Sequence, residues 1–222
     1  MKNKKNIIIF GIGQLGKLAE YYFRTDSKYK VIAFVADDLY VKNKTYCKLP
    51  IVKFSELKKK YPPDKFKVFI ALSYSNMNQD RASKYYLLKE MGYHLVSYIS
   101  SKCVFLSERL VGENCFILEN NIIQPFVKIG QNVFIWSGNH IGHDSIISDH
   151  SFISSHVVIS GNVRIKEYTF IGVNATLRDN IIIAKKSLIG AGSIIMNDTS
   201  ERDVYIANAT SKIKKNSSEI KL

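Results

Sequence analysis

Aliphatic residues recur at every sixth position through the second half of the chain. From Val111 to Ile195, fifteen consecutive positions spaced by six are aliphatic, and thirteen of them are isoleucine. An α-helix would need apolar residues at intervals of three and four, and a single strand would alternate in twos. A period of six instead favours short strands separated by turns and stacked as a parallel β-helix.

A second column of mostly small or β-branched residues follows four positions after the first. It includes Val127, Val133, Ser145, Ser151, Val157, Val163, Thr169, Ala175, Ser187 and Ser193. We expect both columns to point into the β-helix. With three repeats per coil, residues eighteen apart would stack at about the spacing of neighbouring strands, roughly 4.8 Å. The pattern predicts about five coils, with Gly161 one coil above His143.

The first half of the chain has the pattern of an α/β unit. The apolar run 7–10 is typical of a buried parallel strand and ends at the glycine-rich segment 11–16, before a helical pattern over 17–25. Further strands are expected over 31–38 and 67–73, and helices around 55–61 and 80–91. We therefore predict a Rossmann-like domain over residues 1–104 and a β-helix over 105–222.

The spacing of Gly11, Gly13 and Gly16 matches the GxGxxG pattern of nucleotide-binding turns. Such glycines let the backbone approach a phosphate closely and direct a helix N-terminus towards the anion. By itself the pattern also fits a dinucleotide-dependent dehydrogenase, with Asp37 and Asp38 placed for a ribose, or a purely structural turn. The α/β part contains no second mononucleotide-binding half, so a dehydrogenase is the less favoured interpretation.

Charge is distributed unevenly along the chain. Residues 1–104 contain 20 Lys and Arg against 8 Asp and Glu, whereas residues 105–222 contain 12 against 11. No nucleic-acid-binding module accompanies the lysines, so a solvated surface or attraction of a diphosphate ligand is the favoured explanation. The sequence shows neither a membrane-spanning run nor a signal peptide, and its three cysteines form no paired framework. A cytoplasmic location is the simplest expectation.

The order of the two predicted domains resembles that of the bacterial sugar acyltransferases, typified by sialic acid O-acetyltransferases and bacillosamine-pathway N-acetyltransferases. The resemblance extends over essentially the whole chain and includes Ile141-Gly142-His143-Asp144, eighteen residues before Ser160-Gly161-Asn162-Val163. It implies a left-handed β-helix, a nucleotide sugar held by the N-terminal domain, and acetyl-CoA held between the subunits of a homotrimer. His143 is then the candidate general base, Asp144 its acidic neighbour, and His140 the second choice.

A histidine suits this chemistry because an imidazole can accept the proton that an amine loses as it attacks a thioester. The resemblance implies N-acetylation of a nucleotide-linked 4-amino-4,6-dideoxy sugar; O-acetylation and a non-catalytic nucleotide-sensing scaffold are the alternatives. Phe152 stands where some relatives carry a second histidine, and the closing segment 204–212 lacks a proline found in the family. These two departures concern the sugar and CoA contacts respectively.

Other ligand contacts are expected at two places. Tyr74, Asn76 and Arg81 follow the third predicted strand, whose end would border the nucleotide crevice. Small residues that would leave room for the pantetheine arm, or that pack tightly at corners, are Gly161, Gly172, Val173, Gly190 and Ala191. We expect no metal, because His140 and His143 have no third ligand at suitable spacing. A homotrimer would also cover aromatic residues beyond the isoleucine column, namely Phe116, Phe126, Phe134, Trp136 and Phe152.

Overall fold

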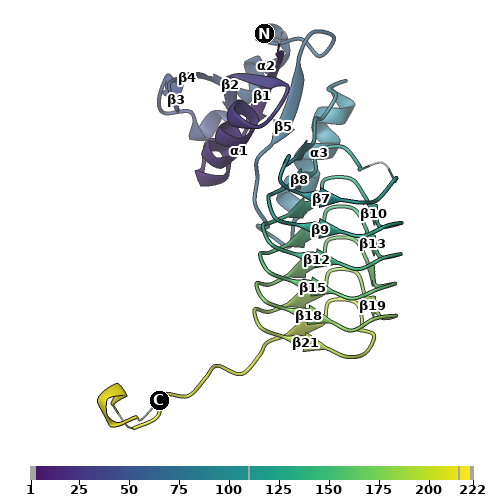
Figure 1. The fold of residues 1–222 in the computed structure, drawn as a ribbon. Coiled ribbons are helices and arrows are strands. Elements are labelled where there is room, and N and C mark those ends of the chain that lie inside the picture. The colour runs from purple at the N-terminus through teal and green to yellow at the C-terminus, as the bar shows by residue number, and fades with distance from the viewer. Residues whose placement is uncertain (1–3, 110, 215, 221–222) are drawn as a thin grey trace.

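The computed structural model describes residues 4–109, 111–214 and 216–220. Figure 1 shows an α/β domain seated on one end of a β-helical prism, with the C-terminal segment leaving the opposite end. None of the described helices has the length and apolar character needed to cross a membrane.

The N-terminal domain is a five-stranded sheet with strand order β3-β4-β2-β1-β5. Neighbouring strands are parallel except β3 and β4, which form an antiparallel hairpin. The strands are β1 (Lys5–Phe10), β2 (Tyr29–Ala36), β3 (Thr45–Tyr46), β4 (Leu49–Lys53) and β5 (Lys67–Ile70). The helices are α1 (Gln14–Thr25), α2 (Leu57–Lys60) and α3 (Gln79–Glu90), with 3₁₀ turns η1 (Asp38–Tyr40) and η2 (Phe54–Glu56). The predicted α/β pattern is confirmed, and the hairpin is an addition to it.

The β-helix consists of two-residue parallel strands arranged in three sheets. The first sheet contains β6 (Tyr98–Ile99), β8 (Phe116–Ile117), β11 (Phe134–Ile135), β14 (Phe152–Ile153), β17 (Phe170–Ile171), β20 (Leu188–Ile189) and β22 (Val204–Tyr205). The second contains β7 (Val104–Phe105), β9 (Ile122–Ile123), β12 (His140–Ile141), β15 (Val158–Ile159), β18 (Thr176–Leu177) and β21 (Ile194–Ile195). The third contains β10 (Lys128–Ile129), β13 (Ile146–Ile147), β16 (Arg164–Ile165) and β19 (Ile182–Ile183). A last 3₁₀ turn, η3 (Ser217–Glu219), lies in the tail.

The predicted register is confirmed throughout the prism. Residues eighteen apart are paired, as in Phe134 with Phe152 and His140 with Val158. The isoleucine column and the column of small and β-branched residues form the interior, where most members are fully buried. The outward residue of each strand therefore determines the chemistry of each face.

The corners between the faces repeat a left-handed backbone conformation every six residues. Positive φ angles occur at Asn114, Asn120, Phe126, Asn132, Gly138, Asp144, His150, His156, Asn162, Tyr168, Asn174, Asn180, Lys186 and Gly192. Asparagine, aspartate and glycine adopt this conformation at the lowest cost, which explains why they fill most of these positions. The recurring asparagines are thus a sequence signal for the corners.

We name the three faces by what lies outside them. The docking face carries β8, β11 and β14, whose phenylalanines pack against the N-terminal domain. The aliphatic face carries the outward residues of β9, β12, β15, β18 and β21. The mixed face carries those of β10, β13, β16 and β19, where Lys128 and Arg164 alternate with isoleucines.

The aromatic residues of the docking face are covered within the chain. Phe116, Phe134 and Phe152 are at most 2% exposed, and Phe69 of β5 lies 5.3 Å from Phe116 and 5.9 Å from Phe134 between ring centroids. These rings therefore give no support for a trimer, contrary to the expectation from sequence. Their partner is the N-terminal domain of the same chain, and of the expected aromatic set Phe126 is the exposed one, at 56%.

A buried polar ladder joins the two domains at the corner between the mixed and docking faces. Asn114 accepts a hydrogen bond from the backbone N–H of Ile70 and donates to Asn132 Oδ1 at 2.7 Å. The Asn132 side-chain nitrogen lies 2.9 Å from His150 Nδ1, and His150 Nε2 lies 2.9 Å from the Tyr86 hydroxyl. One corner position in each of three successive coils is thus tied to the N-terminal domain.

Candidate functional site

His143 lies at the corner between the aliphatic and mixed faces, just after β12. Its backbone N–H donates to Gln124 Oε1 at 2.9 Å, which links it to the preceding coil. Its Nδ1 lies 2.9 Å from Asp144 Oδ2, and Asp144 has a φ of 58°. The left-handed turn at Asp144 brings together two adjacent side chains that would point to opposite sides in a strand.

The other edge of the His143 imidazole lies against the backbone of Gly161. A Cβ atom at Gly161 would lie 2.7 Å from His143 Nε2 and 2.8 Å from Cε1, so the ring occupies the space that any other residue would fill. The predicted stacking of Gly161 on His143 is therefore confirmed. The His143 side chain remains 61% exposed. Its position is fixed from two sides while the ring stays open to a reactant.

The other histidines of the prism have different surroundings. His140 faces outward from the aliphatic face and is partly buried. His156 lies at the corner between the docking and aliphatic faces, against Gly138. His150 belongs to the polar ladder, and burial lowers its pKa to about 4. Among these three, His140 is the one on the aliphatic face, in the strand that leads to the His143 corner.

A cleft of about 490 Å³ opens at the carboxyl ends of β1, β2 and β5. Its lining includes the glycine turn from Gly11 to Leu15, Ala36 and Asp37 after β2, and Ser73 after β5. A second hollow shares Asp37 and Ser73 with it and extends to Asp80 and Lys84. Ligands of open α/β sheets bind at this edge.

The three positions of the turn are occupied by glycine for different structural reasons. A Cβ at Gly11 would lie 2.7 Å from the Ala71 carbonyl oxygen, and one at Gly16 would lie 2.1 Å from the Gly11 oxygen. A Cβ at Gly13 would meet nothing within 4 Å. Packing therefore requires Gly11 and Gly16, whereas Gly13 faces the open cleft at the start of α1, where helix N–H groups lack intrahelical partners.

The two aspartates after β2 point to different partners. Asp37 borders the cleft and pairs with Lys84 of α3. Asp38 bonds to Ser55, through the hydroxyl at 2.6 Å and the backbone N–H at 3.1 Å. The hydrogen bonds from Ser55 lower the pKa of the Asp38 carboxyl. Asp37 is thus the aspartate that the structure brings to the cleft.

The residues after β5 connect the cleft to the prism. Tyr74 packs its ring on Phe152 and Phe170, with centroids 5.0 and 4.9 Å away, and Asn76 is exposed beside Asp80. Arg81, expected near the ligand, is instead completely buried between the domains. Its guanidinium lies 4.3 Å from the centroid of the Phe134 ring. It also donates to the Ser73 carbonyl at 2.7 Å, so its contact with the cleft is indirect.

The remaining small residues lie at the corner between the docking and aliphatic faces. A Cβ at Gly172 would lie 2.6 Å from the Ala191 nitrogen, and one at Gly190 would lie 2.8 Å from the Tyr205 oxygen. These two glycines allow adjacent coils to approach, while Val173 and Ala191 are exposed beside them. This corner and the His143 corner are the two edges of the aliphatic face. Among the described residues, no group of His, Cys, Asp and Glu is arranged to hold a metal ion.

The His143 corner and the glycine-turn cleft lie on different sides of the chain. In a triangular prism, the corner between the aliphatic and mixed faces is opposite the docking face, and the docking face carries the N-terminal domain. A ligand in the cleft would therefore face a different side of the prism from His143 of its own chain.

Comparison with known proteins agrees with the repeat and with the two-domain fold. Residues 126–161 match the family described as bacterial transferase hexapeptide (six repeats). None of the curated protein sequences matches the chain.

Solved structures resemble nearly the whole chain. One is perosamine N-acetyltransferase from Caulobacter crescentus with CoA and GDP-perosamine, at 20% identity and a TM-score of 0.80 over 90% of this chain and 92% of that one. The acetyltransferase domain of PglB from Neisseria gonorrhoeae gives 20% and 0.78 over 90% and 96%. WeeI from Acinetobacter baumannii gives 23% and 0.77 over the same shares. The chain thus has the fold of the left-handed β-helix sugar acetyltransferases, and the resemblance inferred from its sequence is confirmed at that level.

Proposed function

We propose that the protein is an acetyl-CoA-dependent N-acetyltransferase acting on a nucleotide-linked 4-amino-4,6-dideoxy sugar, with His143 as general base. The observation that carries the proposal is the His143 imidazole, held by Asp144 at Nδ1 and by the Gly161 backbone while remaining open to solvent. A scaffold that only sensed nucleotide would have no need for this arrangement.

The hydrogen bond to Asp144 gives each ring nitrogen a role. The carboxylate accepts the Nδ1 proton, which leaves the Nε2 lone pair available to a reactant. As the sugar amine attacks the thioester carbonyl, the C–N bond forms and the amine proton passes to Nε2. Asp144 stabilises the imidazolium, which returns the proton to the CoA sulfur as the C–S bond breaks. Backbone N–H groups beside Gly161 are the candidates to stabilise the thioester oxygen.

The cleft at the glycine turn would hold the nucleotide end of the amino-sugar substrate, which is the acetyl acceptor. Its volume of about 490 Å³ is within the range of small-molecule sites. The open space at Gly13 and the start of α1 suit a diphosphate, and Asp37 is placed to accept a hydrogen bond from a ribose or base. Three of the similar structures, all of the Caulobacter crescentus enzyme, contain CoA and GDP-perosamine, a nucleotide-linked amino sugar.

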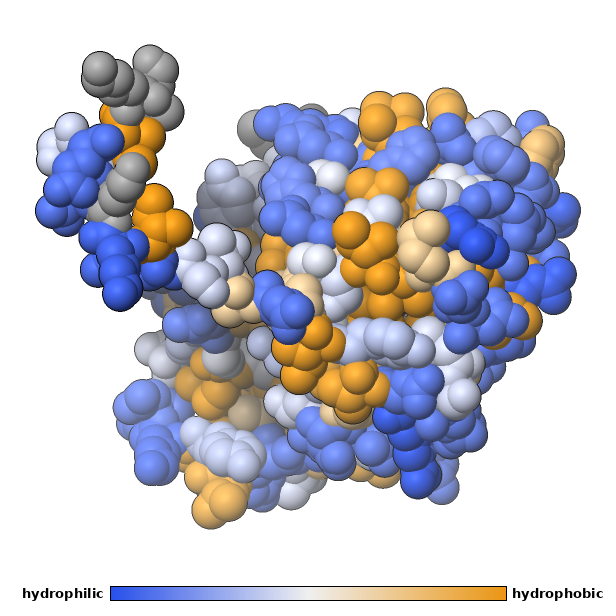
Figure 2. Space-filling view, turned by 90° about the horizontal axis from the view of Figure 1, so that it is seen from below, coloured by the Kyte–Doolittle hydropathy of each residue, from blue (hydrophilic) through white to orange (hydrophobic). Residues whose placement is uncertain are grey.

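The site requires a second copy of the chain. Because His143 lies opposite the docking face, a nucleotide sugar bound in the cleft can reach a His143 only if another subunit presents it. The aliphatic face offers the surface for this contact, since Ile122, Val158 and Ile194 are 43%, 42% and 68% exposed. Figure 2, which views the molecule from the end of the prism away from the N-terminal domain, shows hydrophobic side chains gathered among hydrophilic ones.

A closed homotrimer would satisfy this requirement with equivalent contacts. It would set the His143 corner of one prism beside the Val173 and Ala191 corner of the next, with acetyl-CoA between them.

The activity test measures thiol release from acetyl-CoA with UDP-, dTDP- and GDP-linked amino sugars. At least one should be acetylated, and His143→Asn should lower the turnover number about 10²- to 10⁴-fold. His156→Asn is the matched control, because His156 also lies against a corner glycine but has no part in the proposed chemistry. Equal losses in the two variants, or full activity in His143→Asn, would refute the assignment.

The assembly test uses Val158→Glu, which places a carboxylate on the aliphatic face. Sedimentation should show a trimer for the unmodified protein and a monomer without activity for the variant. Ile182→Glu is the control, since Ile182 is similarly exposed, at 38%, on the mixed face. A monomeric unmodified protein that remains active would contradict the proposal.

A further inference from the structure

We propose that a second cavity in the N-terminal domain binds an organic phosphate with an apolar or aromatic body, and that this ligand changes the affinity of the glycine turn for nucleotide. The cavity has a volume of about 620 Å³. It lies between α1, the beginning of β2 and the turn of the β3–β4 hairpin, and it shares no lining residue with the glycine-turn cleft. The two cavities use opposite ends of β2.

The charges around this cavity are strongly unbalanced. Five of its lining residues are cationic: Lys4, Lys17, Arg24, Lys30 and Lys48. Glu20 is its one acidic lining residue, and the Arg24 guanidinium already pairs with it at 2.9 Å. The other four cations have no further carboxylate among the lining residues. An anionic group is therefore the complement of this rim.

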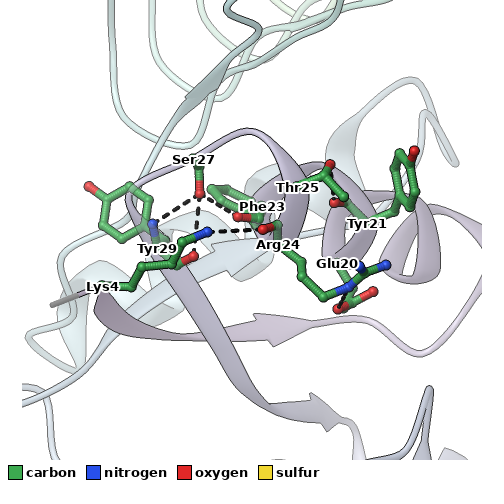
Figure 3. Close-up of polar contacts among 8 residues, drawn as sticks. All are labelled: Lys4, Glu20, Tyr21, Phe23, Arg24, Thr25, Ser27 and Tyr29. Atoms are coloured by element: carbon green, nitrogen blue, oxygen red, sulfur yellow. Dashed lines mark hydrogen bonds and ion pairs between the residues drawn. The ribbon is translucent and has the colours of Figure 1, made fainter. Parts of the chain in front are cut away.

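The walls of the cavity favour a ligand that carries an apolar or aromatic group next to its anionic group. Tyr21, Tyr29, Val31 and Leu49 contribute to its lining. Figure 3 shows Tyr21 and Tyr29 at the two ends of this group, with the Lys4 ammonium bonded to the Arg24 carbonyl between them. Apolar walls with a few charged groups are typical of small-molecule sites. An inorganic ion would use the cations and leave these walls in water.

The hairpin turn that closes the cavity has an unusual sequence for its backbone. Cys47 and Lys48 both have positive φ, 49° and 64°. A two-residue turn of this kind favours Asn-Gly, because other side chains are strained there. The strained Lys48 contributes its ammonium group to the cavity rim. Strain of this sort is concentrated at ligand sites.

Two elements connect the cavity to the glycine turn. The Tyr46 hydroxyl, just before the strained hairpin turn, donates to the Gly13 carbonyl at 3.2 Å. Helix α1, which carries Lys17 and Arg24 into the cavity wall, begins immediately after Gly13. A ligand that moves the hairpin or α1 therefore alters the backbone at Gly13. Such coupling is reciprocal, so nucleotide would change the affinity of the cavity by the same factor.

Calorimetry with three probes tests the binding. Geranyl diphosphate carries both an apolar body and the anion, inorganic diphosphate only the anion, and geraniol only the body. Geranyl diphosphate should bind at least tenfold more tightly than either of the others. Lys30→Glu and Lys48→Glu should each weaken it about fivefold, whereas Lys58→Glu, the same change on α2 outside the cavity, should not. Equal affinity for inorganic diphosphate, or equal losses in all three variants, would overturn the proposal.

A nucleoside diphosphate titrated with and without saturating geranyl diphosphate tests the coupling. The affinity should change at least threefold in the unmodified protein, and Tyr46→Phe should reduce that change while both ligands still bind. Gly13→Ala separates the sites, since it should weaken the nucleotide and leave geranyl diphosphate bound. An unchanged nucleotide affinity, or competition of both probes for the glycine turn alone, would refute an effector site. Neither measurement involves acetyl transfer, so the acetyltransferase proposal is tested independently.

Discussion

Replacing Gly161 with alanine should lower the turnover number while leaving the stability of the protein nearly unchanged. The added Cβ would lie 2.7 Å from His143 Nε2, whereas ordinary contacts begin near 3.4 Å, so the imidazole must retreat by about 0.7 Å. The imidazole is the exposed end of a flexible side chain and can move without disturbing the coils. A displacement of a reacting group on the scale of 1 Å costs about 10²-fold in rate. We expect the turnover number to fall by about that factor.

The stability of the same variant should change little. Gly161 is not among the residues with positive φ, so alanine can adopt its backbone conformation. A compatible Gly→Ala change stabilises a protein by about 0.4–1 kcal/mol through the unfolded chain, equivalent to about 1–4 °C in Tm. Displacing the ring offsets part of this gain. Thermal unfolding should therefore give a Tm within a few degrees of the unmodified protein.

A double-mutant cycle shows whether the effect passes through His143. In a His143→Asn background no imidazole is left to displace, so adding Gly161→Ala should cost little further activity. The assay is steady-state thiol release for the four proteins, with Tm measured on each. The reasoning is refuted if Gly161→Ala keeps the full rate, or if it costs the same factor in both backgrounds.

Three further predictions concern the docking ladder and the glycine turn. Asn132→Ala leaves three buried partners unsatisfied and should lower stability by at least about 3 kcal/mol, seen as a lower Tm; Asn174→Ala, at an exposed corner of similar φ, is the control. His150 has a pKa of about 4 because it is buried, below the 6.5 of an accessible histidine. The contribution of neutral His150 to the free energy of unfolding is therefore complete above pH 6.5 and is lost as the pH falls towards 4. In denaturant titrations, His150→Asn should weaken this dependence of stability on pH. Gly16→Ala should unfold the domain at lower temperature because its Cβ meets the Gly11 oxygen, whereas Gly13→Ala should retain the Tm and weaken nucleotide binding in calorimetry.

The β-helix could be predicted almost completely because each coil repeats one simple physical requirement. Ile141 and Ile159 point inward for the same reason, so a single period describes the entire prism. The stacking of Gly161 on His143 followed directly from that period. The asparagines at the corners, such as Asn162, carry a further but less regular signal through their preference for positive φ.

The docking of the two domains could not be read from the sequence. Phe134 and Phe152 looked like residues for a partner chain, because an outward aromatic gives no sign of which surface will cover it. Arg81 looked like a ligand contact because it follows the third predicted strand, whose end borders the expected crevice. Its guanidinium instead satisfies backbone carbonyls between two domains that are distant in sequence. Such contacts depend on tertiary arrangement and leave no local periodicity.

The polar ladder also fixes the position of the N-terminal domain along the prism. Four successive strands of the docking face present a phenylalanine at the same outward position, so the aromatic contacts alone would allow the N-terminal domain to slip along the prism by one coil. The hydrogen bonds from Arg81 to Asn132 and between Tyr86 and His150 can form only when the N-terminal domain docks at these coils. His143 lies between Asn132 and His150 in the sequence, so this seating also fixes which coil presents the His143 corner at the level of the N-terminal domain. Seating the domain one coil further along would shift that corner, relative to the domain, by one strand spacing, about 4.8 Å. That step approaches the width of a sugar ring, so the seat of the N-terminal domain sets its distance from the His143 corner in discrete steps.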